Sequence, residues 1–317
     1  MKNLIPITLL AFVLLSCGSR QESGGNELRD FPTVTVPALI TEPSQRLEYS
    51  LEHYWDAFFA GDGPTDSSAV LGVGKEDLEY AMASFLELAS LVPKAEGQEA
   101  LGSLFRSIED KQAADTSSHV YLLMTELVSN YLYDPNSPFR DEDLYLPFLR
   151  GMVKSPFTRE EVLPGYIFEE KMCSLNQYGT VAADFRFKDI NGRTGSLHGI
   201  KAEYLVVFFS NPGCESCRDF MLTLRGSEKL SSLVKEGRMA VLNIYIDREL
   251  DKWRDYVHNY PSSWINAYDC DFIIREDAIY NVRAIPSIYL LDRDKKVLMK
   301  DVPPGRVLDF IENSNTL

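Results

Sequence analysis

The sequence has few histidines, few cysteines and no surplus of basic residues. Its 317 residues include four His, five Cys, 32 Lys and Arg, and 47 Asp and Glu, which gives a formal net charge of −15. A nucleic-acid-binding protein needs Lys and Arg to contact phosphates, so this charge argues against that class of function. The His and Cys residues do not stand at the spacing of zinc ligands. We therefore expect no nucleic acid, no bound metal and no cofactor.

The chain also lacks an apolar run long enough to cross a bilayer, which takes about 20 residues. A shorter run, residues 4–15, follows a basic start and is typical of a signal peptide. It ends in Leu14-Leu15-Ser16-Cys17, which resembles the bacterial lipobox. The resemblance implies that residues 1–17 hold a lipoprotein signal peptide and that Cys17 receives lipid. The alternative is an ordinary signal peptide with an incidental Cys.

The predicted lipid places the protein in the cell envelope. Residues 18–43 are polar and rich in Gly and Pro without periodicity, which predicts a flexible tether. No Asp follows Cys17, and by the usual sorting rule for such lipoproteins this favours the outer membrane. We expect a protein that contacts the lipid membrane through Cys17 and faces the periplasm, where disulfides persist.

Residues 44–165 predict an acidic, all-helical domain. Apolar residues recur at helical spacing in the segments 47–59, 78–89, 101–108 and 120–131, and residues 141–153 predict a further helix with an acidic first turn. Residues 1–174 carry 27 acidic and 13 basic side chains, whereas residues 175–317 carry 20 and 19. The negative charge therefore belongs to this half. Nothing in it indicates catalysis, and its partner stays unknown. Residues 166–178 are expected to form a linker.

Residues 179–317 predict a second domain of the α/β class. The continuous apolar runs 204–209 and 239–246 are typical of strands that are buried on both faces. A helix is predicted after each run. Two further strands, 288–292 and 297–299, precede a C-terminal helix. Such alternation of strands and helices indicates an α/β domain.

Two cysteines follow the first of these strands. Cys214-Glu215-Ser216-Cys217 opens a predicted helix. Cys214 would lie at the helix N-terminus, where unpaired N–H groups and the helix dipole stabilise a thiolate. Cys217, three residues on, lies on the same helix face and within reach of a disulfide. The pattern predicts that Cys214 attacks a disulfide and that Cys217 resolves the mixed disulfide.

Three features together resemble the thioredoxin-fold domains of the TlpA/ResA type, which occur in bacterial envelope oxidoreductases. They are Ala183-Asp184-Phe185 before an Asn-Gly hairpin, the buried strand that leads to the Cys-x-x-Cys motif, and Ile285-Pro286-Ser287 before a strand. The whole chain also resembles two-domain lipoproteins of the Bacteroidetes, in which a helical domain of unknown function precedes this module.

The resemblance implies a thioredoxin fold, with a mixed central sheet flanked by helices. It implies a thiol–disulfide oxidoreductase that acts on protein thiols or disulfides and depends on an upstream electron donor. It further implies that the peptide bond before Pro286 is cis and that the backbone of Ile285 pairs with an extended substrate segment.

The sequence departs from the thioredoxin pattern beside the motif. Phe208 stands where cytosolic thioredoxins have a buried acid, so proton transfer with Cys217 needs another group. Asp247, after the second strand, is one candidate, and otherwise it caps a helix. Glu215 is the other candidate. Its charge would raise the pKa of Cys214, which favours a reductant over a strong oxidant.

Other interpretations remain open at this stage. Cys173 and Cys270 could form a disulfide, but no spacing argues for one, so free thiols are favoured. The main alternative to an enzyme is an envelope binding or scaffold lipoprotein, in which the Cys pair is structural or redox-sensing. Metal binding by the Cys pair is a third possibility.

Overall fold

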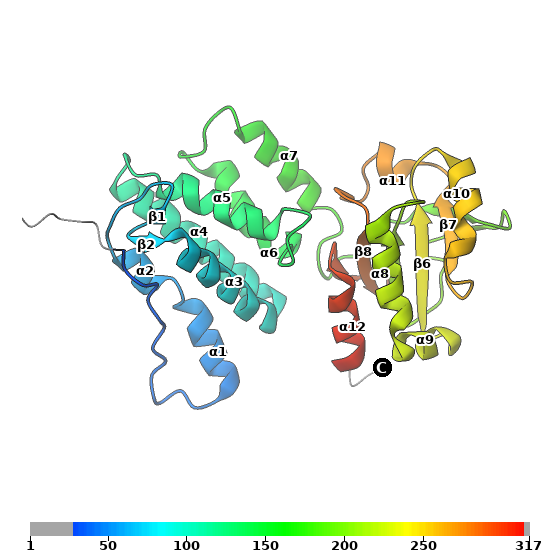
Figure 1. Ribbon diagram of the computed structural model, residues 1–317, viewed down its shortest axis with the longest axis horizontal. Helices are drawn as coiled ribbons and strands as arrows, with labels where there is room; N and C mark the ends of the chain where they lie inside the picture. The colour runs from blue at the N-terminus through cyan, green and yellow to red at the C-terminus, as the bar shows by residue number, and fades with distance from the viewer. Residues whose placement is uncertain (1–27, 314–317) are drawn as a thin grey trace, which may run out of the picture.

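The structure, a computed structural model, describes residues 28–313. It has two parts, a helical domain and an α/β domain, which lie side by side along the long axis of the molecule (Figure 1). The signal peptide and Cys17 expected from the sequence lie outside the described residues. Within residues 28–313, no helix is both long enough and apolar enough to span a membrane.

The helical domain packs around one apolar core. Its helices are α1 (Pro43–Glu52), α2 (Asp56–Ala60), α3 (Lys75–Leu91), α4 (Lys94–Ala114), α5 (Val120–Leu132), α6 (Glu142–Lys154) and α7 (Leu163–Cys173). A short hairpin of β1 (Ala69–Val70) and β2 (Val73–Gly74) precedes α3. The predicted apolar segments fall on α1 to α5, and their apolar faces supply this core. As the sequence predicts, α6 has an acidic first turn, and Asp141 caps it by accepting a hydrogen bond from the N–H of Leu144 at 2.9 Å.

The helical domain differs from its expected boundaries at both ends. Most of the expected linker, residues 166–178, belongs to α7, which packs on α6 and ends at Cys173. The apolar residues of α7 do not gather on one face, so no helical period marks it in the sequence. Within the expected tether, Arg29 donates hydrogen bonds to the carbonyls of Leu71 at 2.7 Å and Phe58 at 2.9 Å. The domain therefore begins before residue 44.

The α/β domain contains one mixed sheet, whose described strands lie in the order β4-β3-β7-β6-β5-β8-β9. The strands are β3 (Arg186–Asp189), β4 (Thr194–Ser196), β5 (Tyr204–Phe209), β6 (Met239–Tyr245), β7 (Ile265–Asp269), β8 (Ser287–Asp292) and β9 (Val297–Lys300). Strand β5 runs parallel to β6 and antiparallel to β8. The expected fold class, a helical domain followed by an α/β domain with a mixed sheet, is confirmed.

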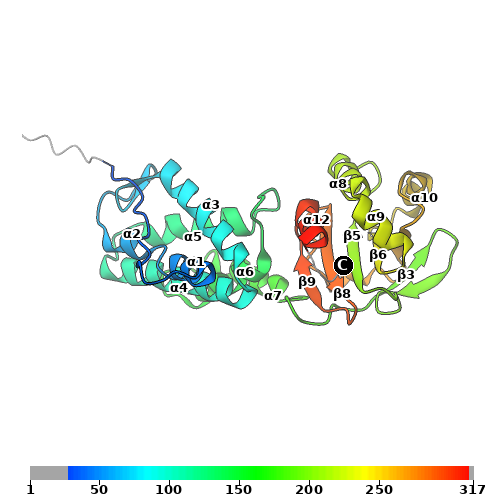
Figure 2. The ribbon, with the colours of Figure 1, turned by 90° about the horizontal axis from the view of Figure 1, so that it is seen from below.

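The helices of the α/β domain pack on this sheet, and all but α11 contribute to the core on one face. They are α8 (Glu215–Gly226), α9 (Glu228–Lys235), α10 (Leu250–Tyr256), the 3-10 helix η1 (Val257–Asn259), α11 (Ile273–Glu276) and α12 (Pro304–Asn313). Figure 2 shows α8 and α12 on the same side of the sheet. The core on that side contains Cys217 and Met221 from α8, Val307 from α12 and Phe208 from β5. Strand β5 and the helix after it, α8, therefore pack against each other through this core.

Strand β7 does not follow from the apolar pattern of the sequence. It lies between β3 and β6, yet its residues Asn266, Tyr268 and Asp269 interrupt any apolar run. The polar side chains have partners: Asn266 accepts a hydrogen bond from Asn243 at 3.0 Å, and Asp269 accepts one from the N–H of Ile274 at 2.8 Å. A strand whose polar groups are satisfied locally can thus be central without being apolar.

Candidate active site at Cys214 and Cys217

The Cys pair stands at the junction of β5 and α8. Strand β5 ends at Phe209, and α8 begins at Glu215 with Cys214 as its N-cap residue. Gly213 has a φ of +74°, a conformation that favours glycine, so the chain can turn sharply into the helix. Cys214 and Cys217 form a disulfide, with 5.2 Å between their Cα atoms. Both cysteines therefore lie at the start of this helix, as the sequence predicts.

The two cysteines have different surroundings. Cys214 is half-buried, whereas Cys217 is only 1% exposed and belongs to the apolar core. The N–H of Cys217 donates a hydrogen bond to Sγ of Cys214 at 3.1 Å. An N–H group at a helix N-terminus stabilises negative charge on the atom that it faces. Cys214 is therefore the more accessible of the two sulfurs and the one that faces an N–H group of the helix N-terminus.

A second segment of the chain completes the surroundings of Cys214. The Ile285–Pro286 peptide bond is cis, as expected. The carbonyl oxygen of Ile285 lies 3.8 Å from Sγ of Cys214. Ser287 then starts β8 opposite Phe209, the last residue of β5. The antiparallel pairing of β5 with β8 thus brings together the two motifs that the sequence singled out.

The two candidate groups for proton transfer, Glu215 and Asp247, contact residues other than Cys217. Glu215 is 83% exposed and lies 3.3 Å from Nη2 of Arg218. Asp247 accepts a hydrogen bond from Nδ2 of Asn211 at 3.1 Å and pairs with Arg275 at 2.8 Å. Asp247 is not a helix cap, because α10 starts after Glu249. It connects instead to the turn that leads into Cys214.

A buried polar group beside this turn was not identified from the sequence. Ser210, directly after β5, donates a hydrogen bond to Oδ1 of Asn243 at 2.5 Å and lies 2.9 Å from the hydroxyl of Tyr260. Burial raises the pKa of Tyr260 to about 12, so this hydroxyl keeps its proton. Ser210 ends the apolar run of β5 and Asn243 interrupts that of β6. These two polar residues are the signal in the sequence for the hydrogen-bonded group of Ser210, Asn243 and Tyr260. The group holds the start of the turn that carries Cys214.

Comparison with known proteins agrees with this geometry. Residues 16–162 match a family described as Domain of unknown function (DUF5106), and residues 202–297 match the family Thioredoxin-like. A thioredoxin-like protein from Bacteroides caccae is 34% identical, and its crystal structure aligns with a TM-score of 0.76 over 90% of this chain and 99% of its own. The chain belongs to the thioredoxin-like proteins. The expected thioredoxin fold of the second domain is thereby confirmed.

Two other solved structures cover less than half of the chain. The C-terminal domain of an uncharacterized protein from Bacteroides fragilis is 35% identical over 44% of this chain and 99% of its own, with a TM-score of 0.42. The thioredoxin domain of a thiol-disulfide oxidoreductase from Bacteroides vulgatus is 21% identical over 42% of this chain and 97% of its own, with a TM-score of 0.36. The comparison with curated proteins gives no match.

The remaining described cysteines of this thioredoxin-like protein are both free. Cys173 is buried at the end of α7, and Cys270 is half-buried after β7. Burial raises the pKa of both thiols, most strongly that of Cys173. The expectation of two free thiols is confirmed. Within the described residues, no three His, Cys, Asp or Glu side chains gather into a group that could hold a metal ion.

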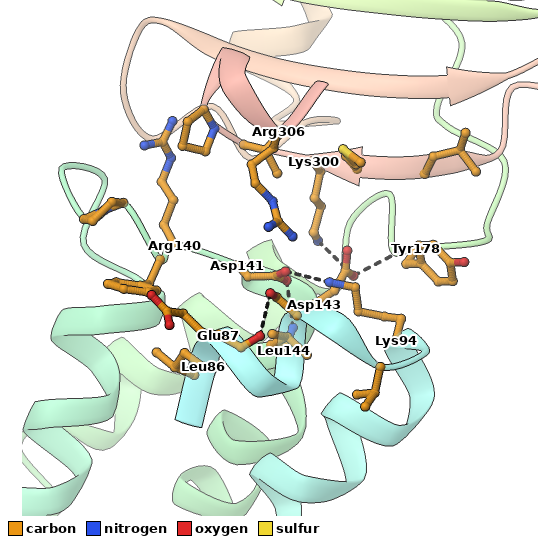
Figure 3. Close-up of a pocket in the computed structure, with 18 of the residues that line it drawn as sticks. Leu86, Glu87, Lys94, Arg140, Asp141, Asp143, Leu144, Tyr178, Lys300 and Arg306 are labelled. Atoms are coloured by element: carbon orange, nitrogen blue, oxygen red, sulfur yellow. Dashed lines mark hydrogen bonds and ion pairs between the residues drawn. The ribbon is translucent and has the colours of Figure 1, made fainter. Parts of the chain in front are cut away.

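A cleft of about 490 Å³ opens between the two domains of the thioredoxin-like protein (Figure 3). Charged side chains from both domains line it, among them Lys94, Arg140, Asp143, Lys300 and Arg306. Lys94 pairs with Asp141 at 2.6 Å, and Lys300 lies 3.7 Å from Asp143. No cysteine lines the cleft, so it is separate from the Cys214–Cys217 pair.

Proposed function

We propose that this protein is a thiol–disulfide oxidoreductase of the cell envelope that exchanges disulfides with protein substrates and acts as a reductant rather than a strong oxidant. The observation that carries the proposal is the position of the Cys214 sulfur. It lies at the N-terminus of α8, accepts a hydrogen bond from the N–H of Cys217 and faces the carbonyl of Ile285. A nucleophilic sulfur thus has a resolving thiol and a peptide main chain beside it.

The first chemical step is attack by the reduced form. The Cys214 thiolate attacks one sulfur of a substrate disulfide, a mixed disulfide forms, and the other substrate sulfur leaves as a thiolate that takes up a proton. The N–H of Cys217 stabilises the attacking sulfur while it is negative. The extended substrate segment pairs with the main chain of Ile285, which lies beside the same sulfur.

The second step resolves the mixed disulfide. Cys217 loses its proton and attacks Sγ of Cys214, which forms the intramolecular disulfide and releases the second substrate thiolate. The Cys pair is thereby oxidised by two electrons, and the substrate disulfide is reduced by two electrons. A dithiol donor of the envelope must then reduce the Cys214–Cys217 disulfide before the next turnover.

The direction of exchange rests on the residues between the two cysteines. Glu215 and Ser216 include an acid and no base. A negative charge next to Cys214 opposes the thiolate, and a less stable thiolate form makes the pair a weaker oxidant. The proposed location in the cell envelope rests on the lipobox-like segment that ends in Cys17. A lipid on Cys17 would anchor the protein so that it faces the periplasm.

Turnover of insulin disulfides in the presence of dithiothreitol tests the proposed activity. The full chain should accelerate the reduction, and Cys214→Ser should lower the rate by about a hundredfold or more. If wild-type protein does not accelerate the reaction, and a genetic phenotype survives both Cys214→Ser and Cys217→Ser, the protein is a scaffold with a structural or sensory Cys pair. Stoichiometric copper or zinc on the purified reduced protein would instead favour metal binding.

A further inference from the structure

The helical and α/β domains meet through a group of buried charged side chains, which we call the interdomain ion cluster. Its members are Arg140, Glu142, Asp143, Arg283, Lys300 and Asp301. The first three belong to the helical domain and the last three to the α/β domain. No member has a side chain more than 12% exposed, and three basic side chains face three carboxyl groups. Because loss of one partner leaves a buried charge uncompensated, such a cluster holds its members in place.

Glu142 contacts three groups across the interface. It starts α6 and is 1% exposed. Its carboxylate accepts a hydrogen bond from Nδ2 of Asn281 at 2.5 Å. The same carboxylate lies 3.1 Å from Nε of Arg283 and 3.3 Å from Nζ of Lys300. One side chain of the helical domain thus binds two nearby residues of the α/β domain, Asn281 and Arg283, as well as the end of β9.

Arg283 is enclosed by residues of both domains. Its Nη2 lies 2.8 Å from Oδ2 of Asp301 in the α/β domain. Its guanidinium carbon lies 4.0 Å from the centre of the Tyr133 ring in the helical domain, a cation–π contact. Together with the ion pair to Glu142, these contacts leave the guanidinium little freedom to move.

Asn281 and Arg283 belong to a segment that has no regular secondary structure. This segment, residues 277–286, connects α11 to β8 and ends at the cis-proline, so we call it the cis-proline loop. Ile285, two residues after Arg283, places its carbonyl 3.8 Å from Sγ of Cys214. Because the loop is not part of the sheet, side-chain contacts from its surroundings decide its position.

The chain segment after α7 contacts the same loop. Nδ2 of Asn176 donates a hydrogen bond to the carbonyl of Ile279 at 2.9 Å. Oδ1 of Asn176 accepts a hydrogen bond from the N–H of Ala183 at 2.8 Å, which fixes the amide itself. The loop is therefore held from the helical side at Ile279, Asn281 and Arg283, all before the residue that faces Cys214.

We propose that the helical domain positions the cis-proline loop of the redox site, with Glu142 and Arg283 as the positioning residues. The inference rests on the proposed function, because it assigns to the helical domain a part in binding polypeptide substrates. The domain sets the place of the Ile285 main chain, which pairs with an extended substrate. A small disulfide without a peptide backbone needs only the Cys214 sulfur, so its reduction does not depend on the position of the Ile285 main chain.

The test compares two neighbouring carboxylates of α6. Glu142→Gln removes the charge that contacts the loop, whereas Asp143→Asn removes an equally buried charge that contacts Lys300 and the N–H of Tyr178 but not the loop. Each full-length variant is assayed with insulin and with hydroxyethyl disulfide. Glu142→Gln should lower kcat/KM for insulin by about tenfold and leave that for hydroxyethyl disulfide within about twofold. Asp143→Asn should change neither beyond about twofold.

Amide hydrogen exchange in residues 279–285 gives a second readout that does not depend on activity. Exchange there should quicken in Glu142→Gln and stay at the wild-type rate in Asp143→Asn. Arg283→Met, which leaves Glu142 paired with Lys300, should reproduce both effects if Glu142→Gln does not fold. Equal insulin kinetics and equal loop exchange in the two carboxylate variants would overturn the inference. A wild-type protein inactive on both disulfides would overturn the proposed function instead, while the loop exchange would still report on the positioning.

Discussion

The carbonyl oxygen of Ile285 lies 3.8 Å from Sγ of Cys214, although the two residues belong to different segments of the α/β domain. The antiparallel pairing of β5 with β8 creates this proximity, because the turn after Phe209 and the loop before Ser287 lie at the same end of the two strands. The Cys214 sulfur and the main chain of Ile285 therefore belong to one candidate site. The same loop reaches the helical domain through Arg283, so the site is not confined to one domain.

Glu215→Gln tests how strongly the acid between the cysteines acts on Cys214. Removal of a negative charge favours the thiolate, so the pKa of the Cys214 thiol should fall. Glu215 is largely exposed and lies near Arg218, so solvent screens its charge and the fall should be about half a pH unit. Thiolate absorbance of the reduced protein as a function of pH measures it. A pKa that stays unchanged or rises would remove the argument for a reductant.

Glu142 should make stability depend on pH. Burial raises its pKa to about 7, although Lys300 and Arg283 act in the opposite direction. In the unfolded chain this pKa is about 4.3, so the folded state binds the proton more tightly. Relative to Glu142→Gln, wild-type protein should therefore lose stability as the pH rises from about 4.5 to about 7, by up to about 3 kcal/mol.

Urea unfolding of both proteins at several pH values checks this expectation. Carboxyls far from the interdomain ion cluster titrate alike in both proteins, and their effects cancel in the difference. If the two stability curves run parallel across this range, Glu142 has an ordinary pKa in the folded state and the interface does not bury it as described.

The two free cysteines should differ in reactivity. Cys173 is buried in the core of the helical domain and its pKa is raised, so iodoacetamide should not modify it in the folded protein. Cys270 is partly exposed and should react slowly at mildly alkaline pH. Peptide mapping by mass spectrometry distinguishes the two sites. Modification of Cys173 at the rate of Cys270 would show that α7 separates readily from the rest of the helical domain.

Cys17→Ser tests the anchor. The wild-type protein should incorporate radiolabelled palmitate in bacterial cells and sediment with the membrane fraction, whereas the variant should do neither. Release of a soluble, unlabelled wild-type protein would show that the apolar start is an ordinary signal peptide.

The apolar pattern predicts the parts of the fold in which burial is continuous. Strands β5 and β6 are runs of buried residues, and the helices α3 to α5 repeat their apolar residues on one face. The missed elements lack such a period: β7 carries Asn266 and Asp269 in its strand, and α7 has apolar residues on all sides. Packing with the rest of the molecule, rather than local pattern, decides these elements.

The residues of the site also fall into those that a local pattern predicts and those that it does not. Cys214, Cys217 and Pro286 stand in recognisable local motifs, so the sequence predicts that they meet. Glu142 is one of three consecutive acids at a helix start and Arg283 lies in a loop, and no local rule connects a helix start in one domain with a loop in the other. Only the packing of the two domains brings them together.

Trapping of mixed disulfides tests the central claim most directly. In Cys217→Ala, Cys214 can attack a substrate disulfide but the mixed disulfide cannot be resolved. Cells that express this variant should accumulate covalent complexes that dithiothreitol releases, and Cys214→Ala/Cys217→Ala should accumulate none. Equal amounts of such complexes in the single and double variants would contradict thiol exchange at Cys214.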